Sequence, residues 1–230
     1  MKIGGLQKLT LIDFPEKPAC TVFLAGCNFR CPWCHSPELV VPEEIEKSPE
    51  IDPEYFFDFL KERKDFLDGV VICGGEPTIN ADLFQFVEKI KSIGYAVKLD
   101  TNGTDPKMIA DLLNAGLLDY VAMDVKAPLE KYKEVTLADV DSAKLRESIA
   151  IIKEMNDYEF RTTVVPEVHT KSDILAIVKE IAPAKRYYLQ KFRGKKVVDN
   201  RFLGKEPYPK EFLEEIKSEI ESDFEICKIR

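Results

Sequence analysis

The 230-residue chain has only two histidines, a single tryptophan and no long apolar run. No stretch approaches the roughly 18 consecutive apolar residues of a membrane-spanning helix, which argues against a membrane protein. The net charge of −8 excludes the broad basic face of a general nucleic-acid binder. The sequence contains no phosphate-binding P-loop, dinucleotide fingerprint or Ser-His-Asp set, so kinase, dehydrogenase and hydrolase functions have little support.

The first residues also lack the basic, apolar and small-residue regions of a signal peptide, so we expect a cytoplasmic protein. In that compartment, clustered cysteines bind metals or take part in catalysis more often than they form disulfides. Three of the six cysteines, Cys27, Cys31 and Cys34, lie within eight residues. These three are the candidate metal ligands.

The spacing C-x3-C-x2-C supplies one thiolate fewer than a closed tetrahedral site requires. Thiolates suit iron–sulfur clusters and also zinc. A four-iron cluster on three thiolates would keep one iron open to a small molecule. A zinc site would need His35 or Cys20 as its fourth ligand, but His35 is adjacent to Cys34 and Cys20 lies in a predicted strand. The pattern therefore favours a [4Fe-4S] cluster, with Cys20, Cys73 and Cys227 as buried or edge thiols.

A second feature is the sequence Gly74-Gly75-Glu76-Pro77, which follows a short apolar run. Two glycines let the backbone adopt positive φ and come close to a ligand, and Glu76 adds a carboxylate at the tip. Alone, the pattern indicates a tight strand-to-helix turn with a solvated glutamate. After a three-cysteine loop, it favours a ligand site.

Short apolar runs alternate with longer amphipathic segments along the whole chain. This is typical of parallel strands buried on both faces and covered by helices. The predicted strands are residues 19–25, 69–73, 95–100, 120–125, 159–165 and 186–191. The predicted helices are residues 53–63, 81–93, 106–115, 142–155, 172–181 and 209–221. Six units fall short of the eight that close a barrel, so we predict an α/β fold, an open partial (β/α)6 TIM-like barrel of parallel strands.

We expect one domain over residues 1–230, because no linker, repeat or low-complexity tract interrupts it. Residues 1–18 would form an N-terminal edge extension, with a strand or hairpin at 3–12. Residues 200–230 would add a C-terminal helix and an edge strand at 224–229.

Polar residues of chemical interest follow the predicted strands, where the functional residues of a parallel barrel gather. Asp100 and Thr101 end the third strand, Asp124 and Lys126 the fourth, and Arg161 lies in the fifth. Each of these could equally be a surface ion pair or a helix cap. The basic stretch at residues 191–201 ends the sixth strand. It is either a solvated loop or a docking surface for a partner of complementary charge.

The cysteine spacing with an aromatic residue before the last cysteine, followed by Gly-Gly-Glu-Pro, resembles the radical S-adenosylmethionine (SAM) superfamily. The segments GLQKLTLIDFP at 5–15, CTVFL at 20–24 and GCNFRCP at 26–32 narrow this resemblance. They are similar to the glycyl-radical-enzyme activases, and resemble most the activating proteins of anaerobic ribonucleoside-triphosphate reductase.

The resemblance implies a [4Fe-4S] cluster on Cys27, Cys31 and Cys34, and SAM as the second cofactor. It implies that a common set of residues binds SAM, namely Trp33, Gly74, Gly75, Glu76, Asp100, Thr101, Asp124, Lys126 and Arg161. It also suggests a monovalent cation near Asp100 and Asp124, to which hard oxygen ligands are suited. No side chain is expected to act as acid or base. For Trp33, sealing of the loop against solvent is the alternative.

The implied reaction is reductive cleavage of SAM to methionine and a 5′-deoxyadenosyl radical, which takes hydrogen from a glycine Cα of a partner enzyme. The implied partner is the anaerobic ribonucleotide reductase. A flavodoxin- or ferredoxin-like protein would donate the electron, because the sequence has no second cysteine cluster. The alternatives are action on another glycyl radical enzyme, of the pyruvate formate-lyase type, or on a small molecule. Non-enzymatic alternatives are an iron–sulfur electron carrier and a zinc-stabilised binding module.

Overall fold

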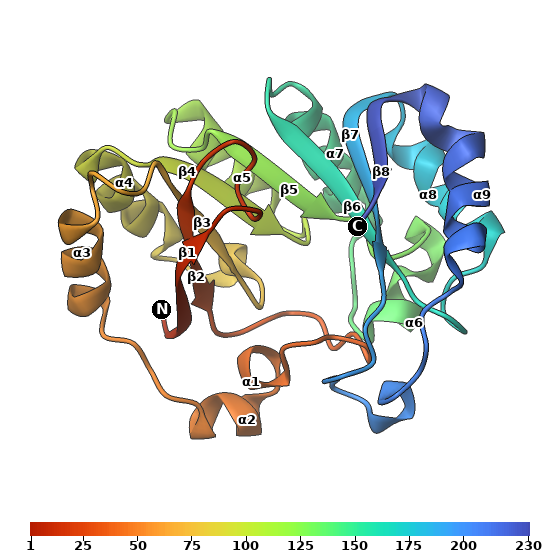
Figure 1. The fold of residues 1–230 in the computed structure, drawn as a ribbon, viewed down its shortest axis with the longest axis horizontal. Coiled ribbons are helices and arrows are strands. Elements are labelled where there is room, and N and C mark those ends of the chain that lie inside the picture. Colours follow the sequence, from red (N-terminus) through yellow and green to blue (C-terminus); the bar gives the residue numbers. More distant parts are fainter. The chain divides into compact units, whose positions relative to one another are not determined.

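A computed structural model describes all 230 residues as an alternation of strands and helices (Figure 1). The strands are β1 (Ile3–Thr10), β2 (Ala19–Leu24), β3 (Gly69–Gly74), β4 (Ala96–Thr101), β5 (Tyr120–Asp124), β6 (Tyr158–Val164), β7 (Ala184–Lys191) and β8 (Phe224–Ile229). They follow one another in chain order in one sheet that runs from β1 to β8. The eight predicted strands, including both edge strands, are therefore confirmed to within a few residues at each end.

The helices lie between the strands in the chain. They are α1 (Pro37–Val40), α2 (Pro42–Lys47), α3 (Pro53–Glu62), α4 (Leu83–Ile93), α5 (Pro106–Asn114), α6 (Tyr132–Thr136), α7 (Ser142–Lys153), α8 (Lys171–Ile181) and α9 (Lys210–Ile220). None of them combines the length and hydrophobicity needed to cross a bilayer. The six predicted helices are present, whereas α1, α2 and α6 were not predicted, because four to six residues are too few to show a helical period.

The chain divides into two compact units. The first contains residues 1–28, 37–101 and 105–121, and the second contains residues 29–36, 102–104 and 122–230. The single domain expected from the sequence stays a prediction. Each unit is built from neighbouring strands with helices packed on them.

In the first unit, β1 pairs antiparallel with β2, and β2 to β4 pair in parallel. The side chains of β2, β3 and β4 are almost all buried, as expected for strands covered on both faces. Helices α3 and α4 meet through stacked and edge-on rings of Phe56, Phe57 and Phe86, with centroids 5.3–5.4 Å apart. The register sets Leu24 opposite Gly74, so the chain leaves β2 and β3 at the same end.

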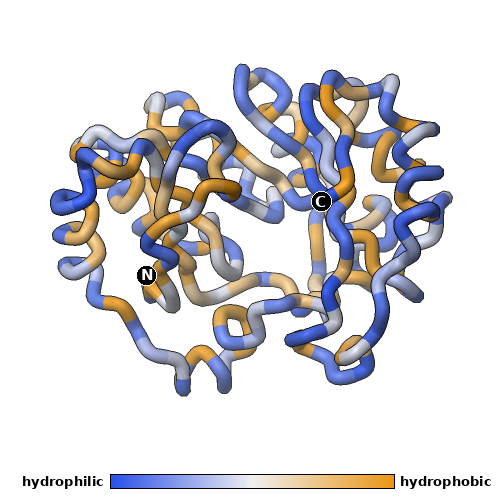
Figure 2. Tube along the Cα trace, viewed as in Figure 1, coloured by the Kyte–Doolittle hydropathy of each residue, from blue (hydrophilic) through white to orange (hydrophobic).

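In the second unit, β6, β7 and β8 pair in parallel, with Tyr187 of β7 between Phe160 and Cys227. Tyr187 is fully buried, and its hydroxyl donates to Thr162 Oγ1 at 2.8 Å. Helices α8 and α9 alternate hydrophobic and hydrophilic residues along the trace, as helices with one buried face do (Figure 2). Thr170 is the N-cap of helix α8 and forms a complete capping box with Asp173.

Candidate functional site

The three clustered cysteines are divided between the two units. Cys27 lies near the end of the segment that leaves β2 in the first unit, whereas Cys31 and Cys34 belong to residues 29–36 of the second. No disulfide joins any of the six cysteines. Within each unit, no three His, Cys, Asp or Glu side chains lie close enough together to hold a metal ion. The first unit contributes one of the three clustered thiols, and the second contributes two. Three thiols within one short segment are nevertheless the donor chemistry that an iron–sulfur cluster requires.

In the second unit, the cysteine-bearing segment is held against helix α6. Arg30 N donates to Thr136 O at 2.8 Å, and the rings of Phe29 and Tyr132 lie 6.2 Å apart, edge to face. A tight turn, in which Cys34 N donates to the carbonyl of Cys31 at 3.0 Å, fixes the spacing of the two cysteines. Cys31 is buried and Cys34 half-buried.

The Gly-Gly-Glu turn in the first unit is fastened to the segment that carries Cys27. Gly75 N donates to Leu24 O at 2.9 Å, and Glu76 N donates to Gly26 O at 2.8 Å. A Cβ on Gly75 would lie 1.9 Å from Gly26 O, and one on Gly74 would lie 2.3 Å from Leu24 O. Gly74 also has a φ of +124°, which favours glycine. Both glycines are thus required by the close approach of two backbone segments.

Glu76 is 1% exposed, so the solvated glutamate that the sequence left open is excluded. Its Oε1 accepts hydrogen bonds from Thr78 N at 3.1 Å, Thr78 Oγ1 at 2.6 Å and Thr101 Oγ1 at 2.7 Å. Glu76 and Thr101, two predicted site residues, are therefore in contact. Thr78 was not predicted; it lies in the short 3-10 turn Pro77–Ile79, which the Glu76 side chain caps by accepting from Thr78 N.

Asp100 is also buried in the first unit, where it forms an ion pair with Lys98. The two residues are two apart on β4, so their side chains share one face of the strand. Lys98 is 1% exposed, and its ammonium lies 5.8 Å from the ring centroid of Tyr120. Lys98 was not among the predicted site residues, although a lysine within an apolar strand is unusual because lysine is rarely buried.

In the second unit, three predicted site residues form one charged group. Asp124 Oδ1 accepts from Arg161 Nε at 2.7 Å, and Oδ2 accepts from Lys126 Nζ at 3.0 Å. Burial opposes ionisation of Asp124, but the two adjacent cations hold its pKa well below the usual range. Burial likewise opposes the charge on Lys126, but Asp124 and then Cys31 raise its pKa above the usual range. Asp124 is therefore ionised and Lys126 protonated.

The backbone of Lys126 is held on both sides by buried side chains. Its N–H donates to Tyr132 Oη at 2.9 Å, and its carbonyl accepts from His169 Nε2 at 2.8 Å. His169 Nδ1 accepts from Val165 N at 3.0 Å, so the imidazole is neutral with its proton on Nε2. Burial lowers the pKa of His169. His169 was not predicted as a site residue, because its contact with Lys126 spans 43 residues of the chain.

Trp33 lies in the second unit between two aromatic neighbours. It is 4% exposed, and its ring meets those of His169 and Phe202 edge-on, at centroid distances of 5.8 and 6.4 Å. These contacts support the sealing role that the sequence left open. The proposed role beside adenine stays a prediction.

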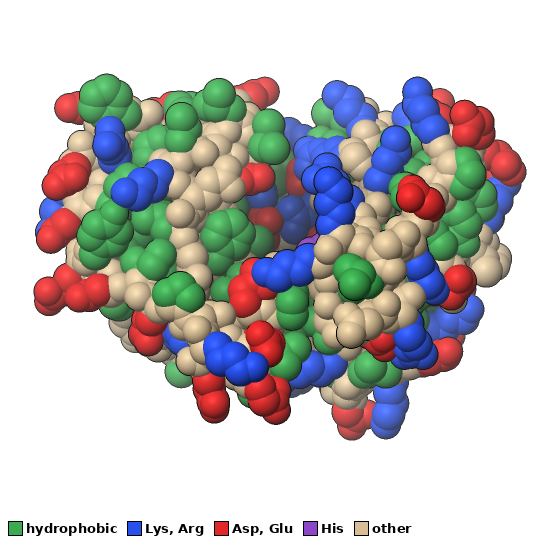
Figure 3. Space-filling view, turned by 60° about the horizontal axis from the view of Figure 1, so that its bottom comes forward, with side chains coloured by type: hydrophobic (Ala, Val, Ile, Leu, Met, Phe, Trp, Pro, Cys, Tyr) green, Lys and Arg blue, Asp and Glu red, His purple; other side chains and the backbone are tan.

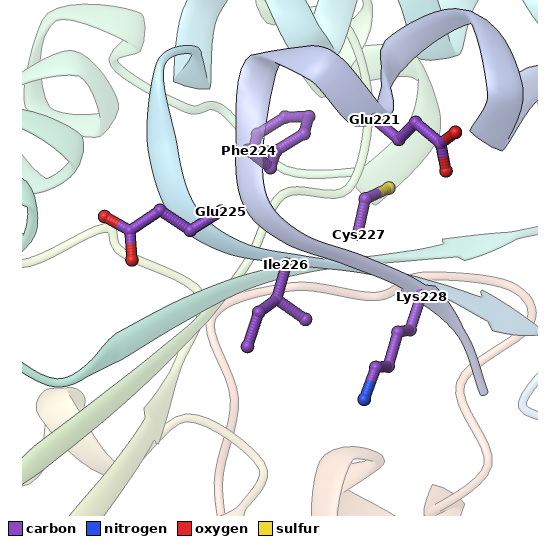
Figure 4. A pocket seen from close by; sticks show the side chains of 6 residues that line it. All are labelled: Glu221, Phe224, Glu225, Ile226, Cys227 and Lys228. Atoms are coloured by element: carbon purple, nitrogen blue, oxygen red, sulfur yellow. The ribbon is translucent and has the colours of Figure 1, made fainter.

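The remaining cysteines behave as buried thiols. Burial raises the pKa of Cys20 to about 12 and that of Cys227 to about 11. Cys227 borders a hollow of about 290 Å³ along β8 in the second unit (Figure 4). That hollow is lined by residues of η4 (Glu221–Asp223) and β8, and none of the predicted site residues borders it.

Comparisons with known proteins agree with the motifs. The Radical SAM superfamily matches residues 21–181. A protein of Methanocaldococcus jannaschii, whose name describes it as a glycyl-radical enzyme activating enzyme, is 38% identical and covers 91% of this chain and 87% of its own. The pyruvate formate-lyase-activating enzyme of Listeria monocytogenes is 31% identical over 54% of this chain and 53% of its own.

Among solved structures, Streptococcus suis SuiB bound to S-adenosylmethionine matches 90% of this chain with a TM-score of 0.66 and 13% identity. The chain spans about half the length of that structure, 51%. At this identity the likeness shows the fold alone. Together with the strand order, it confirms the predicted α/β fold, an open partial barrel of parallel strands.

Proposed function

Because the chain belongs to the Radical SAM superfamily, and within it to the family of the glycyl-radical-enzyme-activating relative, we propose that it activates anaerobic ribonucleoside-triphosphate reductase. In this proposal it cleaves SAM reductively and generates a glycyl radical on the reductase. One observation carries the proposal: the Gly-Gly-Glu turn is bonded, backbone to backbone, to the segment that carries Cys27. A ligand held by the turn would thereby be kept beside the first of the three thiols.

Cys27, Cys31 and Cys34 would hold a [4Fe-4S] cluster, whose donor requirement three thiols fit with one iron left for SAM. When bound, the cluster supplies the electron that converts SAM into methionine and a 5′-deoxyadenosyl radical. Lys126 is protonated beside Cys31, and its charge would favour the thiolate forms that bind metal.

The chain's own residues would orient SAM through opposite charges. Glu76, fixed by three hydrogen bonds, would bind the amine of the methionyl group with its backbone neighbours Gly74 and Gly75. Lys126 and Arg161 would bind the carboxylate. Both cations contact Asp124, and Arg161 also pairs with the buried Glu159, which Arg230 contacts in turn. Three cations and two carboxylates leave the group a positive charge for an anion. Trp33 would border the adenine.

A monovalent cation near Asp100 and Asp124 stays a prediction. Asp100 is paired with Lys98, and both oxygens of Asp124 accept hydrogen bonds from cations. A bound cation would therefore compete with Lys98 for Asp100, and with Lys126 and Arg161 for Asp124.

The reductase as partner rests on the N-terminal segment at 5–15 and its neighbours. A second target, pyruvate formate-lyase, is supported by the likeness to the Listeria monocytogenes enzyme over half of the chain. A glycyl residue at the tip of a partner loop would be the substrate in either case. The electron would come from a flavodoxin- or ferredoxin-like protein.

The test is release of 5′-deoxyadenosine by the anaerobically reconstituted protein with dithionite and SAM. We expect release to depend on reductant and to be lost in Cys34→Ala, whereas the control Cys227→Ala retains it. No release from a protein with a full complement of iron, with or without reductase, would contradict the enzyme assignment. A glycyl-radical signal on added reductase, measured by electron paramagnetic resonance, would support the partner. A glycyl-radical signal on pyruvate formate-lyase, with none on the reductase, would instead identify pyruvate formate-lyase as the target.

A further inference from the structure

The last residue of β7 and the loop that follows it, residues 191–205, are bonded to the cysteine-bearing segment of the second unit. We refer to residues 191–205 as the basic loop. Val198 N donates to Cys34 O at 3.1 Å, and Asp199 N donates to Pro32 O at 2.9 Å. Residues of the basic loop therefore run directly beside the turn that presents Cys34.

Three buried apolar side chains anchor the basic loop, namely Phe192, Val197 and Phe202, each 8% exposed or less. Phe192 stacks on His35 with centroids 5.7 Å apart, and His35 Nδ1 lies 3.1 Å from Lys196 O. Phe202 contacts the ring of Trp33, as described above. Two of these side chains thus contact Trp33 and His35, the residues on either side of Cys34 in the sequence.

The two limbs of the basic loop also cross closely. Gly204 N donates to Gly194 O at 2.7 Å, and a Cβ on Gly194 would lie 2.7 Å from Lys205 O. This crossing leaves no room for a side chain at Gly194. The path of the loop is therefore fixed, and the side chains between its anchors are displayed at defined places.

The displayed side chains carry positive charge. Lys191, Arg193 and Lys195 are exposed, and no ion pair involves them. Arg201, by contrast, donates twice to Asp199 Oδ2, at 2.9 and 2.6 Å. Figure 3 shows Lys and Arg side chains, with Asp and Glu side chains among them, on the right-hand part of the visible surface. In a chain of net charge −8, three exposed cations without an ion pair in so short a segment are distinctive.

We propose that Lys191, Arg193 and Lys195 form the docking surface for an acidic one-electron carrier protein, of the flavodoxin or ferredoxin type. The inference rests on the proposed function, which requires an electron from outside the chain. The other three cysteines, Cys20, Cys73 and Cys227, lie singly on β2, β3 and β8, so the sequence offers no second cysteine cluster that could relay electrons.

The location of the basic loop suits electron entry. Docking there would bring the carrier to the side of Cys34, the more exposed of the two cysteines in the second unit. The reduced carrier loses one electron, and the centre held by the cysteines gains it, with no bond made or broken. Opposite charges on the two proteins would raise the association rate and orient the encounter.

The experiment compares the triple variant Lys191→Glu, Arg193→Glu and Lys195→Glu with a matched control. The control carries Lys144→Glu, Lys179→Glu and Lys210→Glu, three exposed positions on α7, α8 and α9 with the same change of charge. The probe is an oxidised, strongly acidic flavodoxin, titrated calorimetrically against each reconstituted protein at low and high salt. Stopped-flow absorbance then follows reduction by the reduced flavodoxin and, separately, by dithionite.

We expect the loop variant to bind flavodoxin about tenfold or more weakly at low salt, with the difference shrinking at high salt. Its reduction by flavodoxin should slow by a similar factor, while reduction by dithionite and SAM affinity stay unchanged. Equal flavodoxin affinity in the loop variant and the parent, or an equal loss in the control, would overturn the proposal. So would weakened binding of the reductase with unchanged flavodoxin binding, which would assign the surface to the target enzyme. Failure of the proposed function is distinct, because the parent would then release no 5′-deoxyadenosine with dithionite.

Discussion

His169 Nε2 donates a hydrogen bond of 2.8 Å to the carbonyl oxygen of Lys126, and this contact connects two parts of the candidate site. The same ring lies edge-on to Trp33 in the cysteine-bearing segment. One neutral histidine thus fixes both the peptide of a charged site residue and the ring of an aromatic one.

Replacing His169 by Ala should destabilise the protein, because Val165 N–H and Lys126 C=O would lose buried partners. We expect a loss of about 2–4 kcal/mol in the free energy of unfolding, from one or two unsatisfied groups. His169→Gln, whose amide can still donate to the carbonyl, should recover part of it. Urea unfolding of these variants measures the effect, with His35→Ala at an exposed position as control. An equal loss in His35→Ala would contradict this role.

The same burial predicts a pH dependence. Because the pKa of His169 is lowered in the folded protein, the folded state stays neutral when the unfolded chain takes up a proton. The unfolded value is about 6.5, so stability should be constant above it and fall as pH decreases from 7 to 5.5. Urea unfolding at several pH values checks this. The slope should flatten in His169→Gln, and a slope unchanged in that variant would assign the titration to another group.

Thr78 should control the orientation of Glu76 without touching any cysteine. Thr78→Val keeps the shape but removes the hydroxyl that donates to Glu76 Oε1 at 2.6 Å. We expect it to weaken SAM binding about threefold to tenfold, because one of the hydrogen bonds that fix the carboxylate is lost. Equilibrium dialysis of the reconstituted protein measures the affinity. Thr78→Ser, which keeps the hydroxyl, serves as the control, and equal affinity in both variants would refute the role.

Gly75→Ala should be among the most damaging single substitutions in the first unit. The new methyl group would lie 1.9 Å from Gly26 O, a backbone atom that cannot rotate away as a side chain could. We expect a loss of at least about 3 kcal/mol in the free energy of unfolding. Gly116→Ala is the matched control, because its φ is +66° but nothing lies within 4 Å. That variant should lose only about 1–2 kcal/mol through backbone strain. Similar losses in both would show that the crowding at Gly75 is relieved elsewhere.

The sequence predicted the strands well because several of them, such as β2 and β3, are short, nearly continuous apolar runs, whereas β8 alternates apolar and polar residues. The helix caps Asp105 and Thr170 are equally local, since both side chains accept a hydrogen bond from the first turn of their own helix. These are local patterns, in which the residues that specify a feature also form it. Short helices such as α2, which has no buried residue, carry no such pattern.

The contacts of the candidate site were less predictable. The motifs named Glu76 and Thr101 separately, but not their hydrogen bond across 25 residues of sequence. Lys98 lies within an apolar strand, and its ion pair with Asp100 forms because both side chains are on the same face of β4. The reason for Gly75 was also missed, because the atom that crowds it belongs to another strand end.

In the basic loop, the buried residues that anchor the chain are different from the exposed residues that a partner could contact. Phe192, Val197 and Phe202 determine its path, whereas the exposed side chains of Arg193 and Lys195 between them have no ion-pair partner. The outward side chains could therefore change over evolution without moving the cysteine-bearing turn beneath them. A descendant of this chain could adopt a different redox partner through surface substitutions alone, with its interior left intact.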